Sequence, residues 1–358
     1  MRFPYDTSYR DGQSLLRYPV GRIAYGLLFL ALLAAPWVLP KYYVGEISYL
    51  FIMCVASLGL MVLVGYTGQV SLGHSAFVAI GAYAHAWMLG QGVPFALSLL
   101  LAPCITGLIG LVIGLPAIRV SGLYLAMVTL AFAILSEHVI GHWTSVTGGF
   151  SGLTVGNPAM LGFDLSGLRP FYYLCLAVLA LVVLGLVNLM RAKTGRAFMG
   201  VRDSEAAAYS LGIWVSGYKV LAFVVSAMVT GLGGALLAHH VRFLTPEGFG
   251  LIMSLELVLM VTIGGLGSLR GAILGAFLIS MLPTFISRIK PMLPAQVSKQ
   301  FGLEIFVFGL VLALFVLFEP RGLNGRWIKF KAFLETFPLY RQDMFKRGKT
   351  YMKSERYK

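Results

Sequence analysis

The sequence predicts an all-α polytopic membrane protein, with about ten transmembrane helices interrupted by short broken or re-entrant segments. Its 358 residues are 58% hydrophobic and only 12% charged, whereas a soluble domain carries about 25% charged residues. The mean hydropathy is +0.83. Apolar runs of the length needed to cross a bilayer, roughly 17 to 25 residues, recur along the chain. These observations exclude an ordinary soluble domain.

We expect ten spans, each an apolar run that ends at charged residues or turn formers. The first follows basic residues but ends in APWVLP, without the small-residue pattern of a signal-peptide cleavage site. It is therefore interpreted as a span. The expected spans cover residues 23–39, 48–65, 70–89, 95–117, 121–140, 170–190, 219–239, 252–266, 271–287 and 303–319.

The basic residues predict the orientation, because Lys and Arg concentrate in cytoplasmic loops. Ten spans place 22 of the 28 Lys and Arg residues on one face, which we expect to be cytoplasmic. That face then holds both termini and a loop near residues 191–218. The predicted organisation is a cytoplasmic segment at 1–22, a transmembrane domain at 23–320 and a basic cytoplasmic tail at 321–358.

The net charge of +14 follows from this distribution and does not indicate a nucleic-acid partner. Basic cytoplasmic segments instead contact anionic lipid headgroups. The three cysteines lie in separate apolar runs without a CxxC pattern, so we expect packing residues and no disulfide framework.

The segment at 65–83, GYTGQVSLGHSAFVAIGAY, is unusually polar and glycine-rich for its place among apolar spans. Lipid tolerates a broken segment only where protein or water satisfies the backbone groups. Gln69, Ser71 and His74 are therefore candidates to line a substrate pathway. The alternative for the glycines is close helix packing, because Gly73 and Gly81 recur on roughly one helical face.

A second glycine-rich break is expected after the span at 252–266, which is unusually short for a transmembrane helix. Short, glycine-interrupted spans point to the pathway in transporters. Glu256 lies in this span and Glu137 in the span at 121–140. A carboxylate inside a membrane usually faces a cavity or a partner, so both are pathway candidates. The alternatives are a structural pair for Glu256 and an interfacial position for Glu137.

Two loops stand out between the spans. The segment at 141–169 is rich in Gly, Ser and Thr and is expected to form a compact external loop or re-entrant cap. On the opposite face, residues 194–212 read TGRAFMGVRDSEAAAYSLG. A short helix is predicted there, capped by Asp203 and ended by Gly212. It is either an interfacial connector or a docking element for a cytoplasmic partner.

This cytoplasmic loop resembles the coupling segment of ATP-binding-cassette (ABC) importer permeases. The segment at 65–83 closely resembles the signature of the branched-chain amino acid permease family, as do VTIGGLGSLRGAILGA at 261–276 and FEPRGLNG at 318–325. The motifs occur in family order and extend from about 47 to 325. The long outer loop fits the second of the two membrane subunits of such systems. The tail after Phe330 departs from the pattern.

The resemblance implies an importer subunit of a bacterial plasma (inner) membrane, moving branched-chain or other hydrophobic amino acids inward by alternating access. Implied partners are a related permease in a heterodimer, two cytoplasmic ATPases and a periplasmic or extracellular substrate-binding protein. The residues expected to couple to the ATPase are Gly195, Arg196, Arg202, Asp203, Glu205, Ala206 and Ala207.

The chain is not expected to be an enzyme or to bind a cofactor. It lacks the GxxxxGK[ST] loop that cradles ATP phosphates, so partner subunits would use the ATP. No metal site is expected, although His138 and His142 have i, i+4 spacing. Two other functions stay open: a urea or short-amide ABC importer permease, and an ion-coupled secondary transporter.

Overall fold

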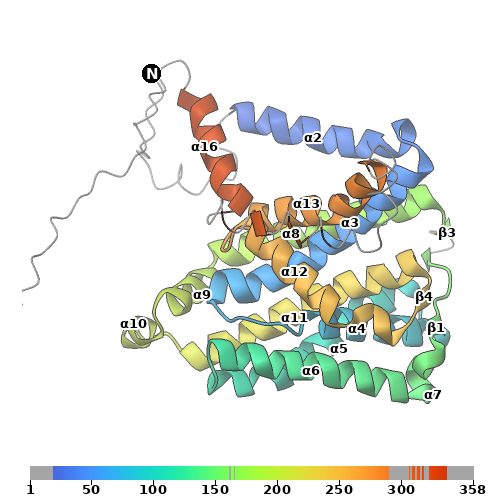
Figure 1. The fold of residues 1–358 in the computed structure, drawn as a ribbon, viewed down its shortest axis with the longest axis horizontal. Coiled ribbons are helices and arrows are strands. Elements are labelled where there is room, and N and C mark those ends of the chain that lie inside the picture. Colours follow the sequence, from blue (N-terminus) through green and yellow to red (C-terminus); the bar gives the residue numbers. More distant parts are fainter. Residues whose placement is uncertain are drawn as a thin grey trace, which may run out of the picture.

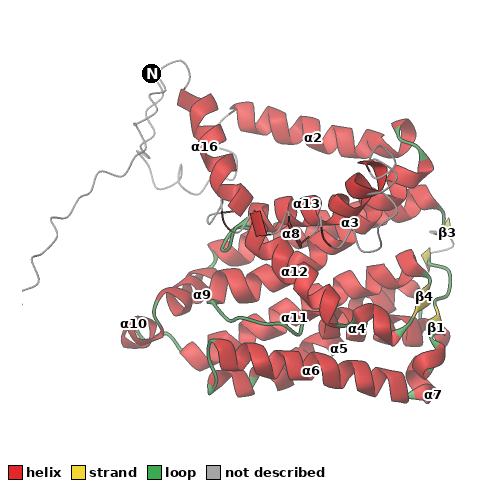
Figure 2. Cartoon of the chain, in the orientation of Figure 1, coloured by secondary structure: helices red, strands yellow, loops and turns green. Residues whose placement is uncertain are grey.

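The computed structural model is a bundle of long helices (Figure 1). It describes residues 19–160, 163–164, 166–289, 306, 309–310, 313–314, 317 and 322–336. Within these residues the strands are very short and lie at one end of the bundle (Figure 2). The all-α polytopic prediction is confirmed.

The helices follow the apolar runs of the sequence. Pro40 and Pro94 precede two of them, where the missing proline N–H costs nothing. In chain order they are α2 (Pro19–Val38), α3 (Lys41–Leu60), the π-helix η1 (Met61–Tyr66), α4 (His74–Gly90), α5 (Phe95–Gly114), η2 (Pro116–Ile118), α6 (Leu123–His142), α7 (Thr144–Thr147), η3 (Gly149–Ser151), α8 (Leu168–Arg191), α9 (Lys193–Asp203), α10 (Glu205–Ser210), α11 (Val215–Val241), η4 (Pro246–Phe249), α12 (Leu251–Gly264), α13 (Leu269–Ile289) and α16 (Gly322–Thr336).

Among the described residues, seven helices are long and apolar enough to cross a membrane. They correspond to seven of the ten predicted spans, and the number ten itself is not confirmed. The apolar part of α2, Ile23–Val38, and the 17-residue α4 are shorter. Helix α4 begins at His74 rather than at residue 70 because the preceding residues leave the helix. The predicted span at 303–319 lies outside the described residues except for six positions.

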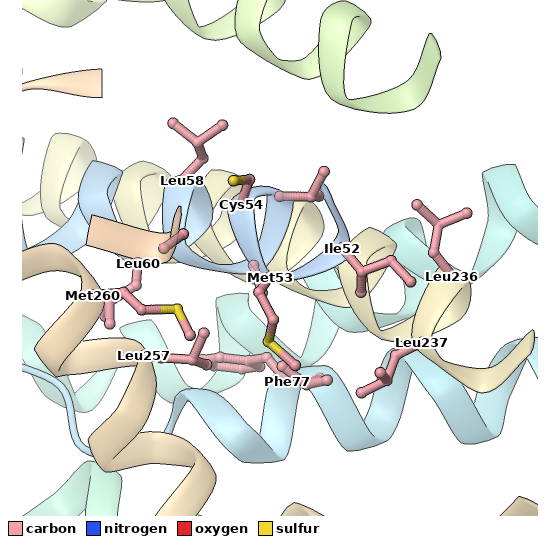
Figure 3. Packing of buried hydrophobic residues seen from close by; sticks show 14 of the residues in the cluster. Ile52, Met53, Cys54, Leu58, Leu60, Phe77, Leu236, Leu237, Leu257 and Met260 are labelled. Atoms are coloured by element: carbon pink, nitrogen blue, oxygen red, sulfur yellow. The ribbon is translucent and has the colours of Figure 1, made fainter. Parts of the chain in front are cut away.

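Helices α3 and α11 form the centre of the bundle. Helix α11 packs against α3, α4 and α5, and α12 packs against α13. The apolar side chains between α3, α4, α11 and α12 are fully or almost fully buried; they include Met53, Phe77, Leu236 and Leu257 (Figure 3).

Peripheral helices carry a different pattern. In α5 and α6 only 33% of the most apolar 18-residue stretch is buried inside the chain. Large apolar side chains such as Leu108 and Leu135 therefore point outward. In water this surface would be an aggregation hazard, whereas in lipid it is the expected covering of a spanning helix.

Glycines set the closest approaches between the central helices. A Cβ atom at Gly81 of α4 would collide with the carbonyl oxygen of Gly231 in α11. A Cβ atom at Gly275 of α13 would likewise collide with the carbonyl oxygen of Met260 in α12. These contacts bear out the close-packing role of the glycine motifs.

The segment at 141–169 is folded by α7, η3 and short strands. Strand β1 (Leu153–Thr154) pairs antiparallel with β4 (Phe243–Leu244), which follows α11. Strand β2 (Ala159–Met160) pairs with β3 (Phe163–Asp164). The first sheet therefore ties this segment to the end of α11.

Candidate transport pathway and coupling site

The polar segment at 65–83 contains a helix break at residues 68–73, between η1 and α4, which we call the first helix break. Gly68 adopts a φ of 71° there. The freed backbone groups find partners inside the protein: the Gln69 amide donates to the Leu63 carbonyl at 3.2 Å, and the Leu72 amide donates to Thr129 Oγ1 at 3.0 Å. Buried protein thus supplies the hydrogen bonds that a broken segment in a membrane requires.

His74 is the first residue of α4 and is fully buried. Its Nδ1 lies 2.8 Å from Ser71 Oγ, and its Nε2 lies 2.8 Å from Ser226 Oγ on α11. Ser226 Oγ in turn donates to the Gly59 carbonyl of α3 at 2.7 Å. The ring therefore connects the first helix break to two central helices, with both nitrogens in use.

Gln69 is the third candidate of this segment and is 5% exposed. Its Nε2 donates to Thr67 Oγ1 at 2.9 Å and to the Lys219 carbonyl at 3.3 Å. Its Oε1 has no hydrogen-bond partner within the described chain. Gln69, Ser71 and His74 are thus all buried, and Ser71 and His74 contact each other. Their role in a pathway stays a prediction.

The two predicted acidic residues lie elsewhere. Glu137 lies on α6 and Glu256 on α12; both are half-buried, and neither forms an ion pair within the described residues. Sequence reasoning missed a third carboxylate, Glu46, because the second span was expected to start at 48. Helix α3 begins at Lys41, and Glu46 Oε2 accepts a hydrogen bond from Thr284 at 3.2 Å.

A buried histidine pair links α4 to α11 away from the first helix break. His85 Nε2 and His239 Nε2 are 2.8 Å apart, and Phe95 packs against both rings. A hydrogen bond between two ring nitrogens requires one to donate and the other to accept. His138 and His142 have ring centroids 5.9 Å apart. Within the described chain, no three His, Cys, Asp or Glu side chains are grouped to hold a metal ion.

The predicted cytoplasmic helix is preceded by a second one, α9, and α9 and α10 together form what we call the coupling segment (193–210). Ser204, not Asp203, caps α10 by accepting from the Ala207 amide at 3.2 Å. The prediction of Asp203 as the cap is wrong, because Asp203 is the last residue of α9 and Ser204 is the residue before α10. Arg202 Nε and Nη2 both donate to Asp203 Oδ1 at 3.1 Å. Gly212 follows α10 with a φ of 77°, as expected for a residue beyond a helix end.

Of the seven residues expected to contact the ATPase, Gly195 is buried and the other six are exposed. Gly195 is buried, and a Cβ atom there would collide with the backbone of Met190 in α8. Arg196 Nη1 donates to the Arg191 carbonyl at 3.2 Å, and Arg202 Nη1 donates to the Gly65 carbonyl at 2.9 Å. Ala206 and Ala207 are exposed. Their contact with an ATPase stays a prediction.

The family is decided by comparison with known proteins. Residues 42–317 match the family described as "Branched-chain amino acid transport system / permease component". This chain belongs to that family. It is 30% identical to the high-affinity branched-chain amino acid transport system permease protein LivM of Salmonella typhimurium, over 83% of this chain and 73% of that protein. With LivM of Escherichia coli the identity is 31% over the same shares.

The permease is also similar to proteins that are named for a different transported molecule. It is 30% identical to the autoinducer 2 import system permease protein LsrC of an Enterobacter species, over 70% of this chain and 71% of that protein. No solved structure matches the chain. Family membership together with the apolar helices makes this permease a multi-pass membrane protein.

Sequence reasoning also missed the exposed apolar side chains of this permease's coupling segment. Tyr209 and Leu211 are 77% and 80% exposed at the end of α10. The signal was present in the sequence, since large apolar residues on a short polar helix outside the spans need a lipid or protein partner.

Proposed function

We propose that this permease is a membrane subunit of an ABC importer that moves branched-chain or other hydrophobic amino acids inward. Alternating access would be driven by two partner ATPases, which bind and hydrolyse the ATP. The observation that supports this most directly is the coupling segment. A glycine-anchored helix pair outside the spans presents Ala206, Ala207, Tyr209 and Leu211 on its exposed surface.

The proposed organisation follows the charge distribution. Residues 1–22, the coupling segment and residues 321–358 lie in the cytoplasm, and the folded segment at 141–169 lies outside. A periplasmic or extracellular binding protein delivers substrate to that outer side. A second, related permease completes the pathway, because one chain supplies half of a heterodimer. The setting is a bacterial inner membrane.

Within the membrane, the proposed pathway residues are Gln69, Ser71, His74, Glu137 and Glu256. The two carboxylates are the stronger candidates, because neither is ion-paired in the described chain and an unpaired carboxylate at membrane depth favours contact with a cavity or ligand. The residues at the first helix break already bind groups of this chain. They would reach substrate only if that break rearranged.

The proposed coupling to the ATPases is tested by substitutions in the assembled complex. Gly195→Arg or Glu205→Arg should abolish ATP-dependent uptake in reconstituted vesicles while leaving membrane insertion intact. Gly195→Arg acts by separating α9 from α8, and Glu205→Arg by placing a cation beside Lys219. Uptake that persisted in both variants, and in wild type without ATPases, would indicate an ion-coupled secondary transporter.

The cargo is tested on the proposed substrate-binding protein, which is sought among the genes that adjoin the permease gene. Its thermal unfolding should shift upward with leucine, isoleucine or valine. A shift with urea or a short amide alone would replace the amino acid assignment, and a shift with autoinducer 2 alone would place this permease functionally beside LsrC.

A further inference from the structure

We propose that Arg202 is a positioning residue that links the coupling segment to two helix breaks at once, so that movement of α9 changes the conformation of both. The inference rests on the proposed function, because it assigns the route by which a docked ATPase would act on the transmembrane helices.

The first contact of Arg202 is with the π-helix η1. Arg202 Nη1 donates to the Gly65 carbonyl at 2.9 Å, across 137 positions of sequence. Gly65 lies in the last turn of η1, immediately before the first helix break. Carbonyls in the last turn of a helix lack partners within that helix, so a charged donor there stabilises the end of η1. The adjoining Gly68 backbone packs on the same side chain, because a Cβ atom at Gly68 would lie 3.1 Å from Arg202 Cγ.

The second contact is with residues 265–268, the second helix break, between α12 and α13. A Cβ atom at Gly267 would lie 2.6 Å from Arg202 Nη1 and 3.3 Å from the Gly65 carbonyl oxygen. Similarly, a Cβ atom at Gly65 would lie 2.8 Å from the Gly267 nitrogen. The end of η1 therefore touches the second helix break, and the guanidinium lies between this contact and Gly68 of the first helix break. A side chain at Gly267 would displace the guanidinium, and the φ of 79° at that position also favours glycine.

The rest of the guanidinium is fixed from the coupling segment. Nε and Nη2 both donate to Asp203 Oδ1 at 3.1 Å. An exposed ion pair of this kind contributes little stability, but the planar guanidinium is held in one orientation by it. Asp203 is the last residue of α9 and precedes the Ser204 cap of α10. A displacement of the α9–α10 junction would thus move the donor of the Gly65 carbonyl.

A second set of contacts connects the coupling segment to the first helix break. Glu205 Oε1 lies 2.7 Å from Lys219 Nζ on α11, and Gln69 Nε2 donates to the Lys219 carbonyl at 3.3 Å. The first helix break is therefore connected to the coupling segment through residues 202 and 205, which lie on either side of the Ser204 cap. Helix ends that absorb changes in backbone angles act as hinges between packed helices. Of these two residues, Arg202 also lies against the second helix break.

The test uses the complete transporter in proteoliposomes, with both permeases, the ATPases and the binding protein. Uptake and ATP hydrolysis are measured separately for wild type, Arg202→Met, Arg202→Lys and the control Arg119→Met. Arg202→Met keeps the length of the side chain and removes its donors. Arg202→Lys keeps one charged donor for the Gly65 carbonyl. Arg119 is an exposed cation on the turn before α6, so its replacement controls for loss of charge.

We expect substrate moved per ATP hydrolysed to fall about tenfold or more in Arg202→Met, as expected for losing a hydrogen bond from a charged donor, so that uptake falls much more than hydrolysis. Arg202→Lys should retain uptake per ATP within about threefold, because its ammonium can still donate a charge-assisted hydrogen bond to the Gly65 carbonyl, and Arg119→Met should match wild type. Unchanged coupling in Arg202→Met would overturn the proposal. So would failure of that variant to assemble, or a parallel fall of both rates, since these would indicate a structural role. Absence of ATP-driven uptake in wild type would instead refute the proposed function.

Discussion

Lys219 Nζ lies 2.7 Å from Glu205 Oε1, although the lysine side chain is only 6% exposed and the glutamate side chain is 51% exposed. Loss of this ion pair therefore affects the solvation of its two partners differently. Glu205 remains hydrated when its partner is removed. Lys219, inside α11, has no other acidic partner in the described part of the chain.

The unequal burial predicts unequal costs of substitution. Glu205→Gln should destabilise the protein by about 1–3 kcal/mol, because it leaves a buried ammonium with a weaker partner. Lys219→Met should cost less than about 1 kcal/mol, because Glu205 can be solvated and the methionine fills the same volume. Thermal unfolding of both variants in the same detergent measures the difference. Equal losses, or a larger loss for Lys219→Met, would contradict the assigned burial.

His74 provides a test between packing and pathway roles. His74→Ala removes both ring nitrogens from Ser71 and Ser226 and leaves a cavity, so we expect a loss of about 2–4 kcal/mol. His142→Ala is the control, because that side chain is exposed and bonds only to its own helix; it should change stability by less than about 1 kcal/mol. A His74 variant of normal stability with an altered KM for uptake would favour the pathway role.

The crossing of α4 and α11 predicts a steric effect at Gly81. Gly81→Ala places a methyl group against the Gly231 carbonyl, which neither backbone can avoid without moving apart. We expect a loss of about 1–3 kcal/mol. Gly185→Ala in α8 meets no atom within 4 Å and should stabilise by up to about 1 kcal/mol through helix propensity. The two unfolding temperatures should therefore shift in opposite directions.

The sequence predicted the lipid-facing helices well, because nearly every position of such a helix is apolar. The expected spans 95–117 and 121–140 correspond to α5 and α6, whose ends differ by two or three residues. The start of α4 was four residues early for a physical reason. Where the chain leaves the helix at residues 68–73, distant groups supply hydrogen bonds: Thr129 Oγ1 accepts from the Leu72 amide, and the Lys219 carbonyl accepts from the Gln69 side chain. No local periodicity carries that information.

The coupling segment shows the same limit of prediction from local sequence. Asp203 and Ser204 are both good helix caps, and Ser204 takes this position because α9 extends to Asp203. The Gly65 contact of Arg202 spans 137 positions, so the residue types alone predicted an outward-facing cation. Composition therefore identified the segment and its glycines, whereas the direction of each long side chain required the structure.

The exposed end of α10 yields the last prediction. Tyr209 and Leu211 point away from the chain, and burying two such side chains against a partner stabilises a complex by roughly 3–5 kcal/mol before other costs. Tyr209→Ser with Leu211→Ser should therefore weaken ATPase co-purification by at least about tenfold while leaving the unfolding temperature of the isolated permease unchanged. Tyr124→Ser is the matched control, since Tyr124 is 73% exposed and belongs to a different helix, α6. If the double variant retained its ATPase, or Tyr124→Ser lost it equally, the α10 surface would not be the docking site, and α10 would be the interfacial connector that its composition equally allows.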